Sequence, residues 1–169
     1  MPYTPIEATA RLRDFPVELE ALVSSLTDEQ LDHKMPGEWT TRQIVHHLAD
    51  SHMSAVFRFK LPLTDPTPPN FIVYDQDAFA ELADYKLPIE PSIILLRGLH
   101  ARFAALLESL TDAQWQMAGS HPQWKLVTVA EVASRYADHC DNHIAQITQF
   151  QARDYAGEEE TWQMMQHHV

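Results

Sequence analysis

The sequence predicts an all-α protein built as a four-helix bundle. Apolar residues recur with helical spacing in four long segments, and the alternation typical of strands is nearly absent. Glycine, which weakens helices, occurs only four times in 169 residues. Four amphipathic helices can bury their apolar faces against one another, so a bundle is the expected architecture. The length fits one domain.

The first two predicted helices occupy residues 6–26 and 41–61. We expect Pro16 either to kink the first helix or to split it in two, because proline removes a backbone donor and clashes with the preceding turn. The second helix repeats apolar residues on one face, which is typical of a helix that covers a core. Its apolar face comprises Ile44, Val45, Leu48, Ala55, Val56 and Phe59.

The third and fourth predicted helices lie in the second half of the chain. The third begins near Ser92, whose hydroxyl suits an N-cap, and ends near Leu110. The fourth runs from Val129 to Arg153. We therefore assign residues 1–153 to one bundle domain and 154–169 to a polar C-terminal extension, in which His167 and His168 are expected to be solvated.

A long proline-rich loop, residues 62–91, connects the second and third helices. Loops longer than about 12–15 residues are uncommon in compact domains and are usually functional. We expect a short helix over residues 75–85 and a role for this loop in lining a pocket. Its prolines are Pro62, Pro66, Pro68, Pro69, Pro88 and Pro91.

The chain contains an internal repeat. The run Ser-Leu-Thr-Asp-Glu-Gln at 25–30 recurs as Ser-Leu-Thr-Asp-Ala-Gln at 109–114. Each run follows an apolar helix and precedes a tryptophan-bearing linker and another helix, and each has the spacing of a capping box. The chain therefore reads as two helical hairpins related by a pseudo-two-fold axis. Convergence of common capping signals is the alternative interpretation.

Composition limits the possible partners. The chain has 24 acidic and 12 basic residues, a net charge of −12, which disfavours nucleic acids and anionic membranes because both are bound through Lys and Arg. The lone cysteine, Cys140, excludes an internal disulfide and is expected in the core. We find neither a signal-peptide pattern nor an apolar run of about 20 residues, so a cytoplasmic protein is expected.

Two histidines in the fourth predicted helix have the spacing of metal ligands. His139 and His143 are four residues apart and therefore lie on the same helix face. His143 falls within the apolar stripe and His139 on its edge, so the pair faces the interior. Buried imidazoles need partners, and a divalent metal ion is a suitable one. The segment lacks the Glu of the H-E-x-x-H metalloprotease motif.

A catalytic site of this kind commonly uses three protein ligands and keeps one position open. The second helix offers His46, His47 and His52. Aligning the two halves of the repeat places His47 on the edge that corresponds to His139, and points His46 toward solvent. Periodicity alone favours His52, which is more central to its apolar face and remains the second choice.

The segments 38–54, 58–61, 74–75 and 99–103, together with the run from Asp138 to Ile147, closely resemble the YfiT-like branch of the DinB superfamily. The resemblance covers nearly the whole chain. It implies a four-helix bundle with pseudo-two-fold symmetry, a homodimer, and one divalent metal, zinc or nickel, held by three histidines. In this chain the matching positions are His47, His139 and His143.

The resemblance and the site together imply a metal-dependent enzyme that acts on a small molecule. We expect it to activate a low-molecular-weight thiol such as bacillithiol for S-transfer to an electrophile. The alternatives are a metal-dependent hydrolase that activates water, and a non-catalytic metal-binding bundle whose fourth position is closed by a residue such as His52. We expect Arg58 and Tyr74 to contact the thiol cofactor, and Asp50 and Asp138 to accept hydrogen bonds from the ligand imidazoles.

Overall fold

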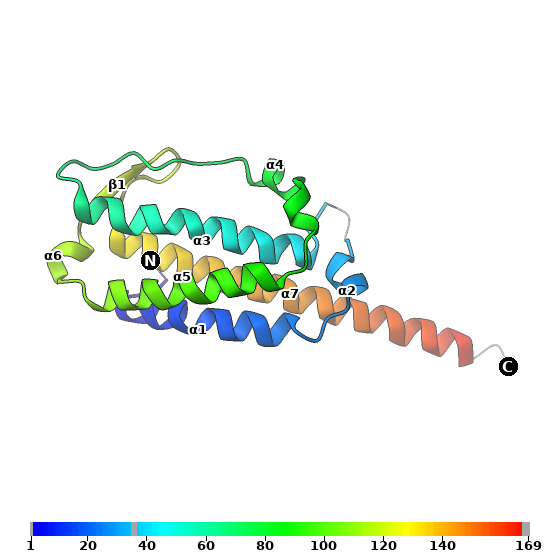
Figure 1. Ribbon diagram of the computed structural model, residues 1–169. Coiled ribbons are helices and arrows are strands. Elements are labelled where there is room, and N and C mark those ends of the chain that lie inside the picture. The colour runs from blue at the N-terminus through cyan, green and yellow to red at the C-terminus, as the bar shows by residue number, and fades with distance from the viewer. Residues whose placement is uncertain (1, 35–36, 167–169) are drawn as a thin grey trace.

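The computed structural model confirms a four-helix bundle (Figure 1). It describes residues 2–34 and 37–166, with side chains up to Ala152. His167 and His168, expected to be solvated, lie outside the described residues. The four long helices are α1 (Pro5–Val23), α3 (Thr41–Thr64), α5 (Glu90–Glu108) and α7 (Val129–Gln166). Helix α7 continues past the predicted end at Arg153 and extends beyond the other helices.

The order of the helices around the bundle is unusual. Helix α1 packs against α5 and α7, and α3 packs against the same two helices, so α1 and α3 lie on one diagonal. In Figure 1, α1 runs in the direction of α7, and α3 in the direction of α5. A two-fold axis that exchanges α1 with α5 and α3 with α7 preserves all these relationships, as the repeat predicts.

The two halves of the repeat differ from the predicted hairpins in one respect. Consecutive long helices in each half are diagonal partners and do not pack side by side. Short helices α2 (Asp28–Asp32) and α6 (Asp112–Trp115), with their linkers, connect the diagonal partners. Both short helices begin with the predicted capping box, formed by Thr27 with Gln30 and by Thr111 with Gln114.

Proline does not interrupt the long helices. Helix α1 passes through Pro16 without a break, so the predicted split is wrong, and the proline ring is buried. Helix α3 likewise passes through Pro62 and ends at Thr64. Each proline gives up one backbone hydrogen bond, and the burial of both rings partly offsets that loss.

The proline-rich connection is long because α3 and α5 are parallel, so the chain must return along the bundle before α5 begins (Figure 1). It contains two short helices, α4 (Gln76–Ala80) and the 3₁₀ helix η1 (Ala83–Lys86), in place of the single predicted helix. Asp75 caps α4 by accepting hydrogen bonds from two backbone N–H groups. Helix α4 then ends after little more than one turn.

Strand-like alternation is nearly absent from the sequence, yet a β-hairpin precedes α7. Strands β1 (Ala118–His121) and β2 (Lys125–Thr128) pair antiparallel. The proline-rich loop, called the crossover loop below, packs against β1. Phe71 N–H donates to the Ser120 carbonyl and Ser120 N–H donates to the Pro69 carbonyl, both at 2.8 Å. Gly119 is required at this contact, since a Cβ atom there would overlap the Phe71 ring.

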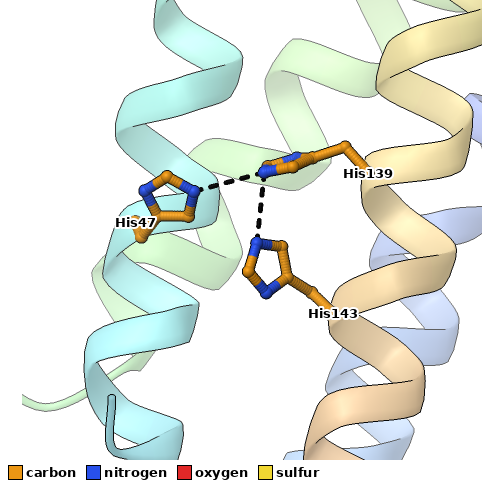
Figure 2. Close-up of side chains that lie close together, drawn as sticks. All are labelled: His47, His139 and His143. Atoms are coloured by element: carbon orange, nitrogen blue, oxygen red, sulfur yellow. Dashed lines mark hydrogen bonds between the residues drawn. The ribbon is translucent and has the colours of Figure 1, made fainter. Parts of the chain in front are cut away.

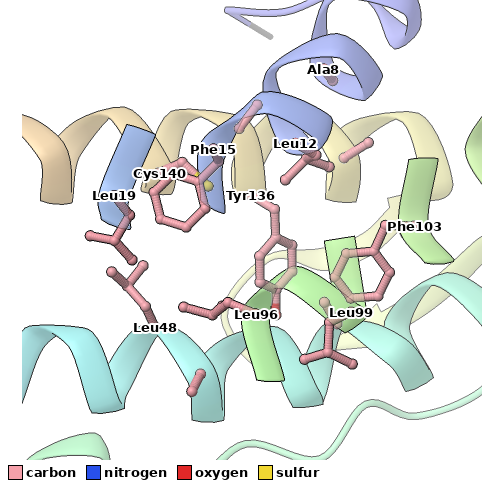
Figure 3. Packing of buried hydrophobic residues seen from close by; sticks show 14 of the residues in the cluster. Ala8, Leu12, Phe15, Leu19, Leu48, Leu96, Leu99, Phe103, Tyr136 and Cys140 are labelled. Atoms are coloured by element: carbon pink, nitrogen blue, oxygen red, sulfur yellow. The ribbon is translucent and has the colours of Figure 1, made fainter. Parts of the chain in front are cut away.

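The core lies between the four long helices (Figure 3). Complete burial of a Leu or Phe side chain contributes roughly 1.5–3 kcal/mol. Cys140 is buried, as predicted. In the described part of the chain, no helix is both long enough and apolar enough to cross a membrane. The largest side chains with almost no exposure include Leu12, Phe15, Leu19, Ile44, Leu48, Phe59, Leu96, Leu107 and Ile147.

The contact between His46 and Ser92, together with the position at which α5 begins, contradicts two predictions. His46 was expected to face solvent, and Ser92 to cap the third helix. Instead His46 is buried, with Nδ1 2.7 Å from the Ser92 hydroxyl and Nε2 3.0 Å from the Leu87 carbonyl oxygen. Helix α5 begins earlier, at Glu90, without a side-chain cap. The α3–α5 interface therefore covers a face of α3 that its own periodicity marks as polar.

Candidate metal centre

Three histidines converge at the interface of α3 and α7 (Figure 2). His47 projects from α3, and His139 and His143 project from consecutive turns of α7. The Nε2 atom of His139 lies 3.2 Å from that of His47 and 3.1 Å from that of His143. One ring nitrogen from each residue lies within 4.8 Å of the other two. The structure thus brings together the three residues that the sequence selected.

The spacing of these nitrogens fits a tetrahedral metal site. Imidazole nitrogens bind zinc at about 2.0–2.1 Å, which places two ligands of a tetrahedron roughly 3.4 Å apart. The two measured separations, 3.1 and 3.2 Å, are close to this edge. Both contacts join Nε2 atoms, and a ring nitrogen of a neutral imidazole carries either a proton or a lone pair, so at least one lone pair points into the cluster. The cluster therefore presents a lone pair that a cation could accept.

The tautomer of His143 is fixed by its neighbour on α7. Its Nδ1 donates to Gln146 Oε1 at 3.0 Å, so Nε2 carries the lone pair that points into the cluster. No pattern in the sequence pointed to Gln146 as a partner of His143. Asp50 and Asp138 were predicted in this role, and this is wrong: Asp50 accepts from the Tyr85 hydroxyl at 2.8 Å, and Asp138 from the Asn142 amide.

Burial keeps the three imidazoles uncharged. It lowers the pKa of His47 to about 3, and repulsion from His143 adds to the effect. The pKa of His139 lies well below its usual value, first because of burial and then because of its two histidine neighbours and Arg58. Burial also lowers the pKa of His143, against the hydrogen bond to Gln146. Neutral imidazole is the form that binds metals.

His52, the second choice for the third ligand, lies outside the cluster. It is fully buried, and its Nδ1 lies 2.6 Å from His100 Nε2. Its ring centroid is 5.8 Å from that of His139. Among the described side chains, Nε2 of His52 and Nδ1 of both His47 and His139 are buried without a hydrogen-bond partner.

A cavity of about 560 Å³ opens onto the cluster. His47 and His139 line it, and the predicted contacts Arg58 and Tyr74 line it as well. The proline-rich loop supplies one wall, as expected, from Val73 to Gln76. A second part of the lining was not predicted. It comes from the β-hairpin and the start of α7, and comprises His121, Gln123, Trp124 and Arg135.

The sequence carried no signal that places these residues in a cavity wall, although Trp124 stands out as the tryptophan of the second linker in the repeat. The hairpin strands have four residues each and only weak alternation. The turn is marked by Pro122 and by the positive φ of Lys125, 62°, which is rare for a residue with a side chain. Only the docking of residues 69–71 on β1 brings the hairpin over the end of α3, and no local pattern encodes that contact.

Comparison with known proteins links the chain to proteins of the same architecture. The model of the DinB superfamily matches residues 11–147. A Bacillus subtilis protein named "Putative metal-dependent hydrolase YfiT" is 44% identical over 146 residues, covering 84% of this chain and 81% of that protein. A protein named as a metal-dependent hydrolase of the same kind, from Oceanobacillus iheyensis, is 41% identical over 138 residues, covering 81% and 80%.

The fold comparison agrees. A solved structure of YfiT from Bacillus subtilis superposes with a TM-score of 0.83 at 41% identity, covering 88% of this chain and 86% of that one. It is described as "a probable metal-dependent hydrolase with an unusual four-helix bundle topology". In this chain, consecutive long helices lie on the diagonals of the bundle, which is also an unusual topology.

Proposed function

The chain belongs to the DinB superfamily, and from this premise we propose that it is a metal-dependent enzyme that transfers a low-molecular-weight thiol to an electrophile. His47, His139 and His143 would hold one divalent transition metal, zinc or nickel. The observation that carries the proposal is the convergence of three neutral imidazoles at the wall of a cavity of about 560 Å³. A cavity of this size accommodates a small organic molecule.

A divalent ion held by three neutral ligands keeps its full charge and acidifies a thiol or a water molecule at its remaining position. The residues around it have separate tasks. Gln146 holds His143 in the tautomer that offers Nε2. Arg58 and Tyr74, which line the cavity, would contact the thiol molecule. Burial keeps the imidazoles neutral and so preserves the lone pairs on which binding depends.

The reaction balances without a further reactant. The thiol loses its proton to solvent, its sulfur forms a bond to the electrophilic carbon, and the leaving group departs with the electron pair of the broken bond. A buried arginine near the cluster favours a thiol that carries an anionic group, because such a group would compensate the guanidinium charge.

Hydrolysis is the second candidate, and the names of the relatives favour it. The same cluster could acidify water in place of a thiol. Asp138, which lines the cavity beside His139, could then accept a proton. A purely structural metal site is less consistent with the geometry, because two of the three histidines border an open cavity.

The experiment uses tag-free protein loaded with zinc or nickel and follows the consumption of monobromobimane with bacillithiol, mycothiol, coenzyme A, glutathione or cysteine. We expect a metal-dependent rate with at least one thiol, lost in His139→Ala and retained in His33→Ala, an exposed histidine on another part of the surface. If no thiol gives a metal-dependent rate, the transferase proposal fails. Thiol-free turnover of nitrophenyl esters or anilides would then establish the hydrolase.

A further inference from the structure

Two arginines at the cavity have no acidic partner. The chain carries twice as many acidic as basic residues, 24 against 12. Four other arginines pair with carboxylates: Arg11, Arg13, Arg42 and Arg97. Among the described side chains, no carboxylate lies within ion-pair distance of Arg58 or Arg135, and both line the cavity beside the histidine cluster. Arg102 on α5 has no ion pair in the described part of the chain either, but it is exposed to solvent and lies away from this cavity. Arg58 and Arg135 differ from it because both face the same cavity beside the histidines, which indicates a site for an external anion.

Arg58 is the more constrained of the two. Its side chain is buried, with only 8% of the residue exposed. Its Nη1 donates to the Tyr136 hydroxyl at 2.8 Å and its Nη2 to the Ile72 carbonyl at 3.4 Å, while Nε has no described partner. Both acceptors are uncharged, so the guanidinium charge stays uncompensated. Burial of an unpaired charge is unfavourable, and an anionic ligand in the cavity would relieve it.

The Trp124 ring contacts both arginines, so the three side chains form one continuous surface. The guanidinium carbon of Arg58 lies 5.3 Å from the Trp124 ring centroid, and that of Arg135 lies 4.9 Å from it. Cation–π contacts of this kind hold guanidinium groups in place without neutralising them. The indole therefore positions both guanidinium groups, and the N–H groups that are not already bonded, Nε of Arg58 among them, remain available to a ligand.

His121 adds a neutral donor to the same wall. Its Nδ1 accepts the backbone N–H groups of Gln123 and Trp124, at 3.2 and 3.3 Å, so the ring proton resides on Nε2. The ring stacks on Trp124 with centroids 3.9 Å apart. Burial lowers the pKa of His121, and the charges of Arg58 and Arg135 lower it further. The cavity wall thus presents two cations and an N–H donor within reach of one another.

We propose that Arg58, Arg135 and the Trp124 ring form an anion-binding subsite, which takes a carboxylate or phosphate group of the molecule whose reactive end meets the histidine cluster. Guanidinium forks match both groups in geometry. The subsite deepens the proposed function and relies on it for the reaction, but the binding itself needs no metal. It makes the substrate, or the thiol, a small organic anion and excludes uncharged molecules as the preferred ligand.

The test measures anion binding to the full chain by calorimetry, first without metal so that the histidine cluster does not contribute. The probes are malate for carboxylates, inorganic phosphate for phosphates, and malamide as the uncharged counterpart of malate. We expect malate or phosphate to bind and malamide not to bind. Preference for one anion identifies the group that the natural ligand carries. Equal binding of malate and malamide would overturn the proposal.

Arg135→Gln is the decisive variant, because Arg135 is exposed and its replacement leaves the core intact. Loss of one charged hydrogen bond should weaken anion binding about tenfold. Arg97→Gln is the matched control, since it removes the same charge from a surface arginine paired with Glu20. If both variants bind the anion as the wild type does, the subsite is disproved. Arg58→Lys provides a second measurement at the buried position.

The result of the anion-binding test does not depend on the result of the thiol-transfer test. Anion binding by the metal-free protein, weakened by Arg135→Gln, stands even if no thiol is ever transferred. In metal-loaded protein, the same variant should raise KM for an anionic thiol at least several-fold and leave KM for a neutral electrophile unchanged. A fall in kcat with both KM values unchanged would contradict a binding role.

Discussion

His52 Nδ1 lies 2.6 Å from His100 Nε2, and His100 Nδ1 in turn hydrogen-bonds to the Leu12 carbonyl oxygen. A carbonyl only accepts, so His100 must donate from Nδ1 and accept at Nε2. His52 must then donate from Nδ1, which leaves a lone pair on its buried Nε2. The chain of contacts links α3, α5 and α1 through the centre of the bundle and fixes one tautomer for each imidazole.

The first prediction concerns this buried pair. His100→Leu should lower the free energy of unfolding by about 2–4 kcal/mol, because the Leu12 carbonyl and the His52 N–H both lose a partner, at roughly 1–3 kcal/mol each. His100→Gln should recover part of this loss, since its amide can donate and accept along the same line. Urea unfolding of the metal-free variants measures both values. Equal destabilisation by Leu and Gln would contradict the hydrogen-bonded chain.

The second prediction concerns pH. Burial lowers the pKa of His100 to about 4, against an ordinary value of 6.5. Between these values the unfolded chain binds the proton and the folded protein does not, so stability is full above pH 6.5 and falls as the pH drops toward 4. At pH 5 this histidine accounts for a loss of roughly 2 kcal/mol.

Unfolding of metal-free protein at pH 7.5 and pH 5 provides the measurement. The difference in unfolding free energy between the two pH values should be about 2 kcal/mol smaller in His100→Gln than in the wild type. An unchanged difference in His100→Gln would show that this histidine titrates normally in the folded protein.

Local pattern was sufficient to predict the bundle and the pair His139 and His143, for a physical reason. The phase of an amphipathic helix is set by its own sequence, and the i, i+4 spacing of His139 and His143 places both on one face. The repeat then selected His47, because the axis that exchanges α3 with α7 relates the two faces across their interface. Symmetry supplied the long-range information that periodicity lacks.

The missed features all depend on contacts between distant segments. His46 lies on a side of α3 that its own apolar pattern does not mark as core, and it is buried only because Ser92 and Leu87 cover it. Trp124 and Arg135 share a cavity wall with the β-hairpin, whose Ser120 pairs with Pro69 and Phe71 of the proline-rich loop, a segment distant in the sequence. Such pairings are set by tertiary packing, which overrides short-range preference in brief strands.

The third prediction concerns Gln146, which accepts the Nδ1 proton of His143. Replacing the partner of a ligating histidine typically costs 10–100-fold in metal affinity. Gln146→Leu should therefore weaken zinc binding by at least tenfold, and Gln146→Glu should strengthen it, because a carboxylate makes the imidazole more basic. Competition with a chromogenic chelator measures both. Thr148→Ala, an exposed change on the same helix, is the control and should leave affinity unchanged.

The fourth prediction compares two glycines. A Cβ atom at Gly119 would overlap the buried Phe71 ring, whereas one at Gly98 on α5 meets nothing within 4 Å. Gly98→Ala should stabilise the protein by about 0.5–1 kcal/mol, because alanine loses less conformational freedom in a helix. Gly119→Ala should destabilise it by roughly 1–3 kcal/mol, the cost of overpacking a core.

The same pair tests whether the docked hairpin shapes the cavity. If Phe71 is displaced, the contacts between β1 and the crossover loop are lost. The cavity wall that carries Trp124 and Arg135 should then shift. Gly119→Ala should therefore weaken malate or phosphate binding by the metal-free protein, while Gly98→Ala should not. Urea unfolding and calorimetry on the same two variants separate stability from binding. Gly119→Ala protein could instead be destabilised and still bind the anion with wild-type affinity. The anion subsite would then survive the loss of the contact between the hairpin and the loop, which would show that the hairpin forms independently of the loop.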